Sequence, residues 1–96
     1  MSQEIKHKEN DTRGMFYLED EKGIISELTY TKQSSGVLII DHTETRTELE
    51  GNGLASSLLK RSVEYARENN YKINPLCPFA EVQFDEHKEY RDVLAV

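Results

Sequence analysis

Two glycines, Gly51 and Gly53, flank one asparagine in the stretch LEGNGLASSLL, which covers residues 49–59. Glycine has no Cβ and adopts positive φ readily, so a ligand can approach its main chain closely. Main-chain N–H groups at the start of a helix, together with the helix dipole, favour an anion such as a phosphate or pyrophosphate. On the residues alone two interpretations stay open: a turn that begins a helix, and a cradle for a pyrophosphate. Two glycines at this spacing are common, which favours the turn.

Two widespread phosphate-binding motifs do not account for this loop. The dinucleotide fingerprint requires three glycines in a βαβ unit, and Ser56 stands at the third position. A Walker-type loop requires a following Gly-Lys-Ser/Thr, which is missing. Glu48 and Glu50 suit the helix dipole but oppose a nearby phosphate, so main-chain N–H groups would have to hold an anion. Candidate charge partners are Arg46, Lys60 and Arg61.

The stretch NPLCPFA, residues 74–80, places the single cysteine, Cys77, between two prolines and just before an expected helix. A helix N-terminus stabilises a thiolate, which is the nucleophilic form of cysteine. Alternatively, Cys77 is a small buried apolar residue, the commoner role for an isolated cysteine. The proline bracket favours the nucleophile only slightly.

A metal site is not expected. The HTE motif at residues 42–44 and Cys77 partly match the pattern H-x-E…P-C-x-x-C of zinc deaminases, but Ala80 replaces the second cysteine. A zinc ion would need His7 or His87 from elsewhere in the chain. A nucleophilic pair of Cys77 with a histidine is compatible with the spacing, although nothing specific supports it.

Local patterns predict the elements that carry these residues. Runs of strand formers between turn residues predict an antiparallel β-meander of three or four strands, at residues 5–8, 15–19, 24–32 and 37–40. Apolar residues at helical spacing predict a long helix that begins near Asn52 or Gly53 and ends at residues 69–70. A short strand at 71–74, a helix at 78–87 and a tail that packs through Tyr90, Val93 and Leu94 complete an α+β fold.

The composition limits the remaining choices. A chain of 96 residues forms one domain, here residues 1–96. The formal net charge of -6 and the lack of clustered Lys and Arg argue against a nucleic-acid partner. No apolar run suits a signal peptide or a membrane span, and a lone thiol suits a reducing compartment, so we expect a cytoplasmic protein without a membrane partner. An exposed sheet edge leaves a monomer or a weak homodimer open.

Three motifs together, IIDHTET, LEGNGLASSLL and INPLCPF, resemble the small single-domain branch of the GNAT superfamily, the YjdJ-like N-acetyltransferases. The resemblance covers the chain from about Ile5 to Tyr90. In the superfamily the loop reads Gln/Arg-x-x-Gly-x-Gly/Ala, and its amides grip the pyrophosphate of coenzyme A. Gly51 and Gly53 match, whereas Glu48 stands where Gln or Arg is usual. The segments that usually build the acceptor pocket are reduced to a turn at residues 11–14.

The resemblance implies an acyl-CoA-dependent N-acyltransferase that moves acetyl from acetyl-CoA to an unknown amine. The implied coenzyme-binding residues are His42, Thr43, Gly51, Asn52, Gly53, Leu54, Ala55, Cys77, Pro78 and Phe79. Glu44 and His42 are the candidate bases for the amine proton, and Cys77 is a candidate acyl relay or proton donor. Two alternatives stay open: a non-catalytic module that binds coenzyme A or a protein, and an interaction domain without a coenzyme.

Overall fold

A computed structural model describes residues 4–95 of the chain. Its centre is a five-stranded sheet in which the strands follow the chain order. The strands are β1 (Lys6–Glu9), β2 (Arg13–Asp20), β3 (Gly23–Lys32), β4 (Val37–Thr45) and β5 (Lys72–Pro75). The helices are α1 (Leu54–Asn69) and α2 (Pro78–Glu86). A short 3-10 helix, η1 (Thr47–Leu49), precedes α1, and a second, η2 (Lys88–Val93), follows α2.

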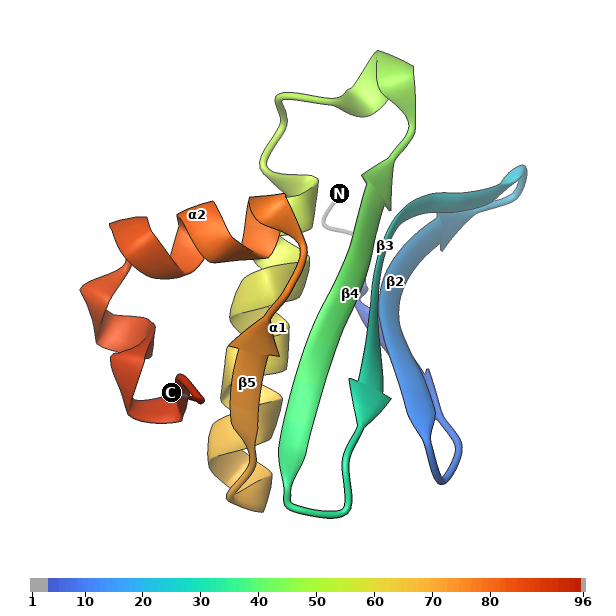
Figure 1. The fold of residues 1–96 in the computed structure, drawn as a ribbon. Helices are drawn as coiled ribbons and strands as arrows, with labels where there is room; N and C mark the ends of the chain where they lie inside the picture. Colours follow the sequence, from blue (N-terminus) through green and yellow to red (C-terminus); the bar gives the residue numbers. More distant parts are fainter. Residues whose placement is uncertain (1–3, 96) are drawn as a thin grey trace.

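The predicted α+β fold, a β-meander followed by a long helix, a short strand and a short helix, is confirmed. Strands β1 to β4 pair antiparallel with their neighbours in the chain. Strand β5 pairs parallel with β4, because α1 carries the chain back to the starting end of β4 (Figure 1). The sheet is therefore mixed, and its one parallel pair follows a βαβ crossover.

The ends of α1 have local causes. The helix begins at Leu54 rather than at Asn52 or Gly53, because Gly53 has a left-handed φ of 76° and stands outside it as the N-cap. It ends at Asn69, where the sequence predicted the stop. Asn70 adopts a left-handed conformation with φ of 60°, and its N–H is bonded to carbonyls of the last turn.

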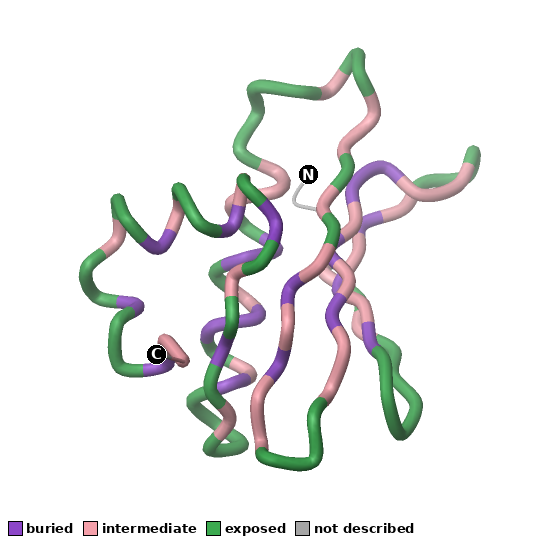
Figure 2. The backbone as a smooth tube through the Cα atoms, viewed as in Figure 1, coloured by how far each residue is buried: buried purple, intermediate pink, exposed green. Residues whose placement is uncertain are grey.

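Helix α1 covers one face of the sheet, and no helix of residues 4–95 covers the opposite face, here called the open face (Figure 1). The buried face of α1 consists of Leu58, Leu59, Ser62, Val63 and Ala66. Figure 2 shows that the strands β3, β4 and β5, which α1 covers, each contain buried positions. Leu58 and Leu59 are both fully buried, so truncating either to alanine costs about 2–5 kcal/mol.

The C-terminal segment returns to this layer, as predicted for the tail. Tyr90 and Val93 of η2 are buried, and Leu94 forms a parallel bridge with Ile73 of β5. Helix α2 ends at Glu86 and not at residue 87, where the main chain leaves the helical region. The tail thereby completes the core beyond the edge strand β5.

A polar cluster lies where β1, β2 and β3 meet the C-terminal half of α1. Glu9 Oε2 accepts hydrogen bonds from Tyr30 Oη at 2.6 Å and Tyr65 Oη at 2.9 Å, and Lys32 Nζ lies 3.3 Å from Oε1. His7 Nε2 lies 2.6 Å from Tyr30 Oη. We call these five residues the Glu9 network. It satisfies polar groups that would be costly to bury without partners.

Candidate functional site

A cavity of about 460 Å³ opens at the N-terminus of α1. It lies between the end of β4, the following loop and the start of α2. The lining residues are 43–45, 49–51, 53–56 and Phe79. Residues far apart in the sequence thus meet at one end of the α1–sheet layer.

The glycine loop leaves main-chain groups and space available to this cavity. Gly51 and Gly53 have φ of 85° and 76°, and a Cβ built on either would meet nothing within 4 Å. No side chain caps the N-terminus of α1, and the first helical bond runs from Ser57 N–H to Gly53 O. The N–H groups of residues 54–56 therefore point out of the helix start, where an anion is favoured.

The cavity begins where β4 and β5 part. Their pairing ends at Ile40 and Pro75. The N–H groups of Leu76 and Cys77 both donate to Ile40 O, at 3.1 and 3.0 Å. Beyond this point, within the described residues, the edge of β4 at 41–45 has no partner strand on the β5 side. An extended ligand could add to this edge as a further strand does.

Strand β4 continues past its predicted end at Ile40 and carries a bulge at Asp41. Thr29 of β3 pairs with His42, whereas the next residue, Tyr30, pairs with Ile40. Asp41 therefore has no partner residue in β3. A bulge of this kind inserts one residue and bends the strand.

The bulge reverses the inward and outward alternation of β4. Before it, Leu38 and Ile40 are buried in the helix layer. After it, Thr43 lies opposite the buried Leu28, and Thr45 Oγ1 lies 2.8 Å from Oγ of the buried Ser26. The two threonines therefore face α1 and the cavity, although an unbroken alternation would place residues 42 and 44 there.

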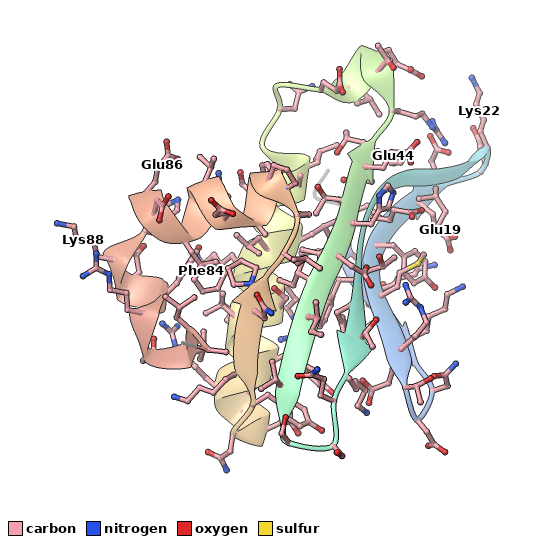
Figure 3. All side chains as sticks on the ribbon, in the orientation of Figure 1. Glu19, Lys22, Glu44, Phe84, Glu86 and Lys88 are labelled. Atoms are coloured by element: carbon pink, nitrogen blue, oxygen red, sulfur yellow. The ribbon has the colours of Figure 1, made fainter. Side chains whose placement is uncertain are left out.

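His42 and Glu44 consequently lie on the open face. The His42 Nε2 atom is 3.2 Å from Glu44 Oε1 and 3.8 Å from Glu27 Oε2. Their side chains are 50% and 72% exposed. Glu44 also reaches the rim of the cavity, at the upper end of β4 in Figure 3, whereas His42 is not among the lining residues.

Cys77 is the N-cap residue of α2. Its Sγ accepts the N–H of Ala80 at 3.4 Å, and Pro78 occupies the first turn, as the proline position predicted. The residue is 8% exposed, and Sγ lies 3.9 Å from Oγ1 of Thr43. The thiol therefore sits directly behind a residue that lines the cavity, and its structural role as a cap is compatible with a chemical one.

The charge around the cavity is negative. The two charged residues that line it are Glu44 and Glu50. Arg46 points to the β2–β3 turn, where it makes two hydrogen bonds of 3.0 and 2.9 Å to Asp20. These bonds, helped by the N–H of Lys22, lower the pKa of Asp20 to about 2. Arg46 is thus committed to a carboxylate instead of the loop.

The lining of this cavity can be compared with the coenzyme-binding residues that the resemblance implies, which stay predictions. Of the residues implied by the resemblance, those that line it are Thr43, Gly51, Gly53, Leu54, Ala55 and Phe79. Those that do not line it are His42, Asn52, Cys77 and Pro78; the His42 side chain lies on the open face, and the Asn52 amide donates to Leu49 O at 3.0 Å. The residues not singled out as binding residues are Thr45, Leu49, Glu50 and Ser56. Proximity to the glycines could have indicated the last three, but only the bulge brings Thr45 inward.

Comparison with known proteins shows the family of the chain. A family model described as GCN5-related N-acetyl-transferase matches residues 15–93. The chain belongs to this family. A GCN5-like protein from Staphylococcus aureus, assigned as an N-acetyltransferase, is 41% identical, with a TM-score of 0.78, over 99% of this chain and 91% of that one. Acyl-CoA-dependent N-acetyl transfer is the function that this assignment supports, in agreement with the predicted resemblance.

More distant acetyltransferase structures share the fold. A Clostridium acetobutylicum protein assigned as an acetyltransferase, solved with acetyl-CoA, is 20% identical, with a TM-score of 0.62. An IAA acetyltransferase from Bacillus cereus is 12% identical, with a TM-score of 0.60. The chain covers 57% and 53% of these two proteins, and 80% and 78% of its own length matches them. No curated protein matches the chain at a significant level.

Residues 4–95 contain no group of three or more His, Cys, Asp or Glu side chains that could hold a metal ion. None of the helices described is long and apolar enough to cross a membrane.

Proposed function

We propose that the cavity at the N-terminus of α1 binds acetyl-CoA and that the chain transfers its acetyl group to an amine. One observation carries the proposal: two left-handed glycines with open space beside them precede a helix start that no side chain caps. A cradle of this form fits a pyrophosphate, because N–H groups and the helix dipole converge on it. Glu50 at the same rim opposes the negative charge, so we expect modest affinity.

The unpaired edge of β4 would hold the pantetheine arm. Residues 41–45 offer main-chain donors and acceptors on the side where β5 has turned away. The arm contains amide groups, which can pair with such an edge as an added strand does. Thr43 and Phe79 line the cavity beside this edge and would contact the arm. The thioester would then lie near the bulge, close to Thr43 and Cys77.

In the transfer step the amine nitrogen attacks the thioester carbonyl, the C–N bond forms, and the C–S bond breaks. Main-chain N–H groups of β4 would stabilise the oxyanion. The His42–Glu44 pair, on the other face of β4, would take the amine proton through water. Cys77 would return a proton to the departing thiolate, or would first accept the acetyl group and pass it to the amine.

A titration with coenzyme A, followed by amide NMR, tests the binding site. Shifts concentrated at Thr43 and residues 51–56 are expected. No shift at millimolar ligand, which corresponds to binding weaker than about -4 kcal/mol, would overturn the proposal. Binding without any acetyl transfer to a panel of amines would instead identify a non-catalytic coenzyme-binding module.

The role of Cys77 needs its own variant. Cys77→Ala should leave coenzyme A binding in place and slow acetyl transfer. A second variant, Cys77→Ser, keeps a polar cap for α2, so loss of folding cannot explain a slow rate in both. Unchanged transfer in both variants would eliminate the relay and the proton-donor roles together.

A further inference from the structure

The bulge of β4 is held by side chains that the proposed transfer does not use. Asp41 Oδ1 accepts a hydrogen bond from Thr29 Oγ1 at 2.7 Å, and Oδ2 accepts one from Thr31 Oγ1 at 3.0 Å. Arg13 donates to Asp41 Oδ2 at 3.3 Å and to Thr31 Oγ1 at 3.0 Å. These four residues, the Asp41 network, tie the bulged residue to β3 and β2 on the open face.

Hydrogen bonds at this residue matter because a slip of one position moves every later side chain to the other face of a sheet. If β4 continued past Ile40 in unbroken alternation, with Asp41 paired instead of bulged, His42 and Glu44 would follow Leu38 and Ile40 into the helix layer. Thr43 would leave the cavity and its contact with the Cys77 thiol. The bulge also coincides with the point where β4 and β5 part, so it sets the direction of the unpaired edge.

We infer that Asp41 is a positioning residue for the coenzyme site. Its carboxylate, held by the hydroxyls of Thr29 and Thr31, fixes the bulge that turns Thr43 and the unpaired edge of β4 towards the cavity. The Asp41 side chain acts through Thr43 and the main chain and does not itself touch the coenzyme. The inference deepens the proposed function and rests on it for every readout that uses coenzyme A.

The sharpest variant is Thr29→Val together with Thr31→Val, which removes both hydroxyl donors and keeps the branched shape that strands favour. We expect affinity for coenzyme A to fall about tenfold, because a binding edge that is no longer pre-organised has to be ordered when the ligand binds. Asp41→Ala should show the same loss. Thr29→Ser with Thr31→Ser keeps the donors and should bind as the wild type does.

A matched control breaks an equally good carboxylate pair elsewhere. Asp92→Asn removes the negative charge and leaves one acceptor oxygen, so Arg67 keeps at most one of its two hydrogen bonds of 2.9 Å, at the opposite end of α1. It should lower stability without changing affinity for coenzyme A. An affinity loss in Asp92→Asn equal to that of the valine variant would mean general destabilisation and would overturn the inference.

A second readout needs no coenzyme. Cross-strand NOEs report the pairing of Leu28 with Thr43 and of Thr29 with His42. They should weaken in the valine variant and in Asp41→Ala and persist in Asp92→Asn. Unchanged NOEs overturn the inference, and so do lost NOEs with unchanged affinity. If the wild type itself binds no coenzyme A, the proposed function fails, and the NOEs alone still decide whether Asp41 holds the bulge.

Discussion

The two ends of α1 are built in opposite ways. At its N-terminus lie a cavity of about 460 Å³, two glycines with open space around them and a helix start without a side-chain cap. Beneath its C-terminal half the Glu9 network joins β1 and β3 to Tyr65, and the His7 ring stacks on Phe16 at 4.0 Å. The N-terminal end of α1 leaves main-chain donors available to a ligand, whereas the polar groups near the C-terminal end are bonded to one another.

Glycine serves both ends for different reasons. At Gly53 the backbone has positive φ and the space for a Cβ is empty. Gly14 has no such φ, but a Cβ there would lie 2.3 Å from Cζ and Oη of Tyr30. One glycine keeps space open for a ligand, and the other lets an aromatic ring pack against the main chain. Replacing glycine by alanine should therefore lower mainly ligand affinity at Gly53 and mainly stability at Gly14.

The largest effect is expected from Gly14→Ala. The new methyl group collides with the ring of Tyr30, which is fully buried and cannot move freely, so the free energy of unfolding should fall by about 2–3 kcal/mol. Urea denaturation measures the change. Affinity for coenzyme A should survive in the folded fraction. In a double-mutant cycle, Tyr30→Leu should recover part of the loss; strictly additive effects would show that the collision is not the cause.

A smaller effect is expected from Gly53→Ala at the N-terminus of α1. An L-residue in the left-handed region costs about 1–2 kcal/mol, and the methyl group enters the space beside the cavity, so affinity for coenzyme A should fall about tenfold (1.4 kcal/mol). Calorimetric titration provides the measurement.

Gly36→Ala is the matched control for this variant, because Gly36 has φ of 88° and equally empty surroundings in the β3–β4 turn. It should lose similar stability and keep its affinity. Equal affinity losses in both variants would remove the argument that the glycine loop is a ligand cradle.

Local patterns predicted most of the fold. The helical spacing of apolar residues in α1 and the turn clusters between β1 and β4 act over a few residues, so one segment of sequence suffices to recognise each. The glycine loop could be identified in the same way. Its chemistry depends on Gly51 and Gly53 themselves and on the helix that follows.

The bulge and the Glu9 network could not be predicted because both are cross-strand properties. Nothing at Asp41 marks the extra residue; its partners Thr29 and Thr31 lie in the preceding strand. His7 entered the sequence argument only as a remote zinc ligand. Its actual neighbours, Phe16 and Tyr30, come from two other strands and meet it only in the assembled sheet.

The pH dependence of the free energy of unfolding should report the Glu9 network at the C-terminal half of α1. Burial lowers the pKa of His7, so the unfolded chain takes up this proton first as the pH falls. Burial raises the pKa of Glu9, but hydrogen bonds from Tyr30, Tyr65 and Lys32 outweigh this and leave its pKa below the usual value. Both groups thus stabilise the fold above their unfolded pKa values and lose this contribution as the pH falls.

The expected curve declines in two steps, one below about pH 6.5 from His7 and one below about pH 4.3 from Glu9. Chemical denaturation at a series of pH values measures it. His7→Gln should abolish the upper step, while His87→Gln, at a partly exposed histidine of the C-terminal segment, should leave it. A free energy of unfolding that increases as the pH falls from 6.5 to 5 in the wild type would contradict the assignment of the upper step to His7.

The smallest effect is expected at Glu50, which lines the cavity at the N-terminus of α1. Glu50→Gln removes a negative charge next to the expected pyrophosphate. An exposed charge is worth roughly 0.2–1 kcal/mol, so affinity for coenzyme A should rise by about 1.4- to fivefold at low salt. Salt screens exposed charges, with a Debye length of about 3 Å at 1 M, so the gain should disappear there. Glu86→Gln, at the far end of α2 (Figure 3), should change nothing. A gain that survives 1 M salt would point to altered loop geometry, because only a charge effect is removed by screening.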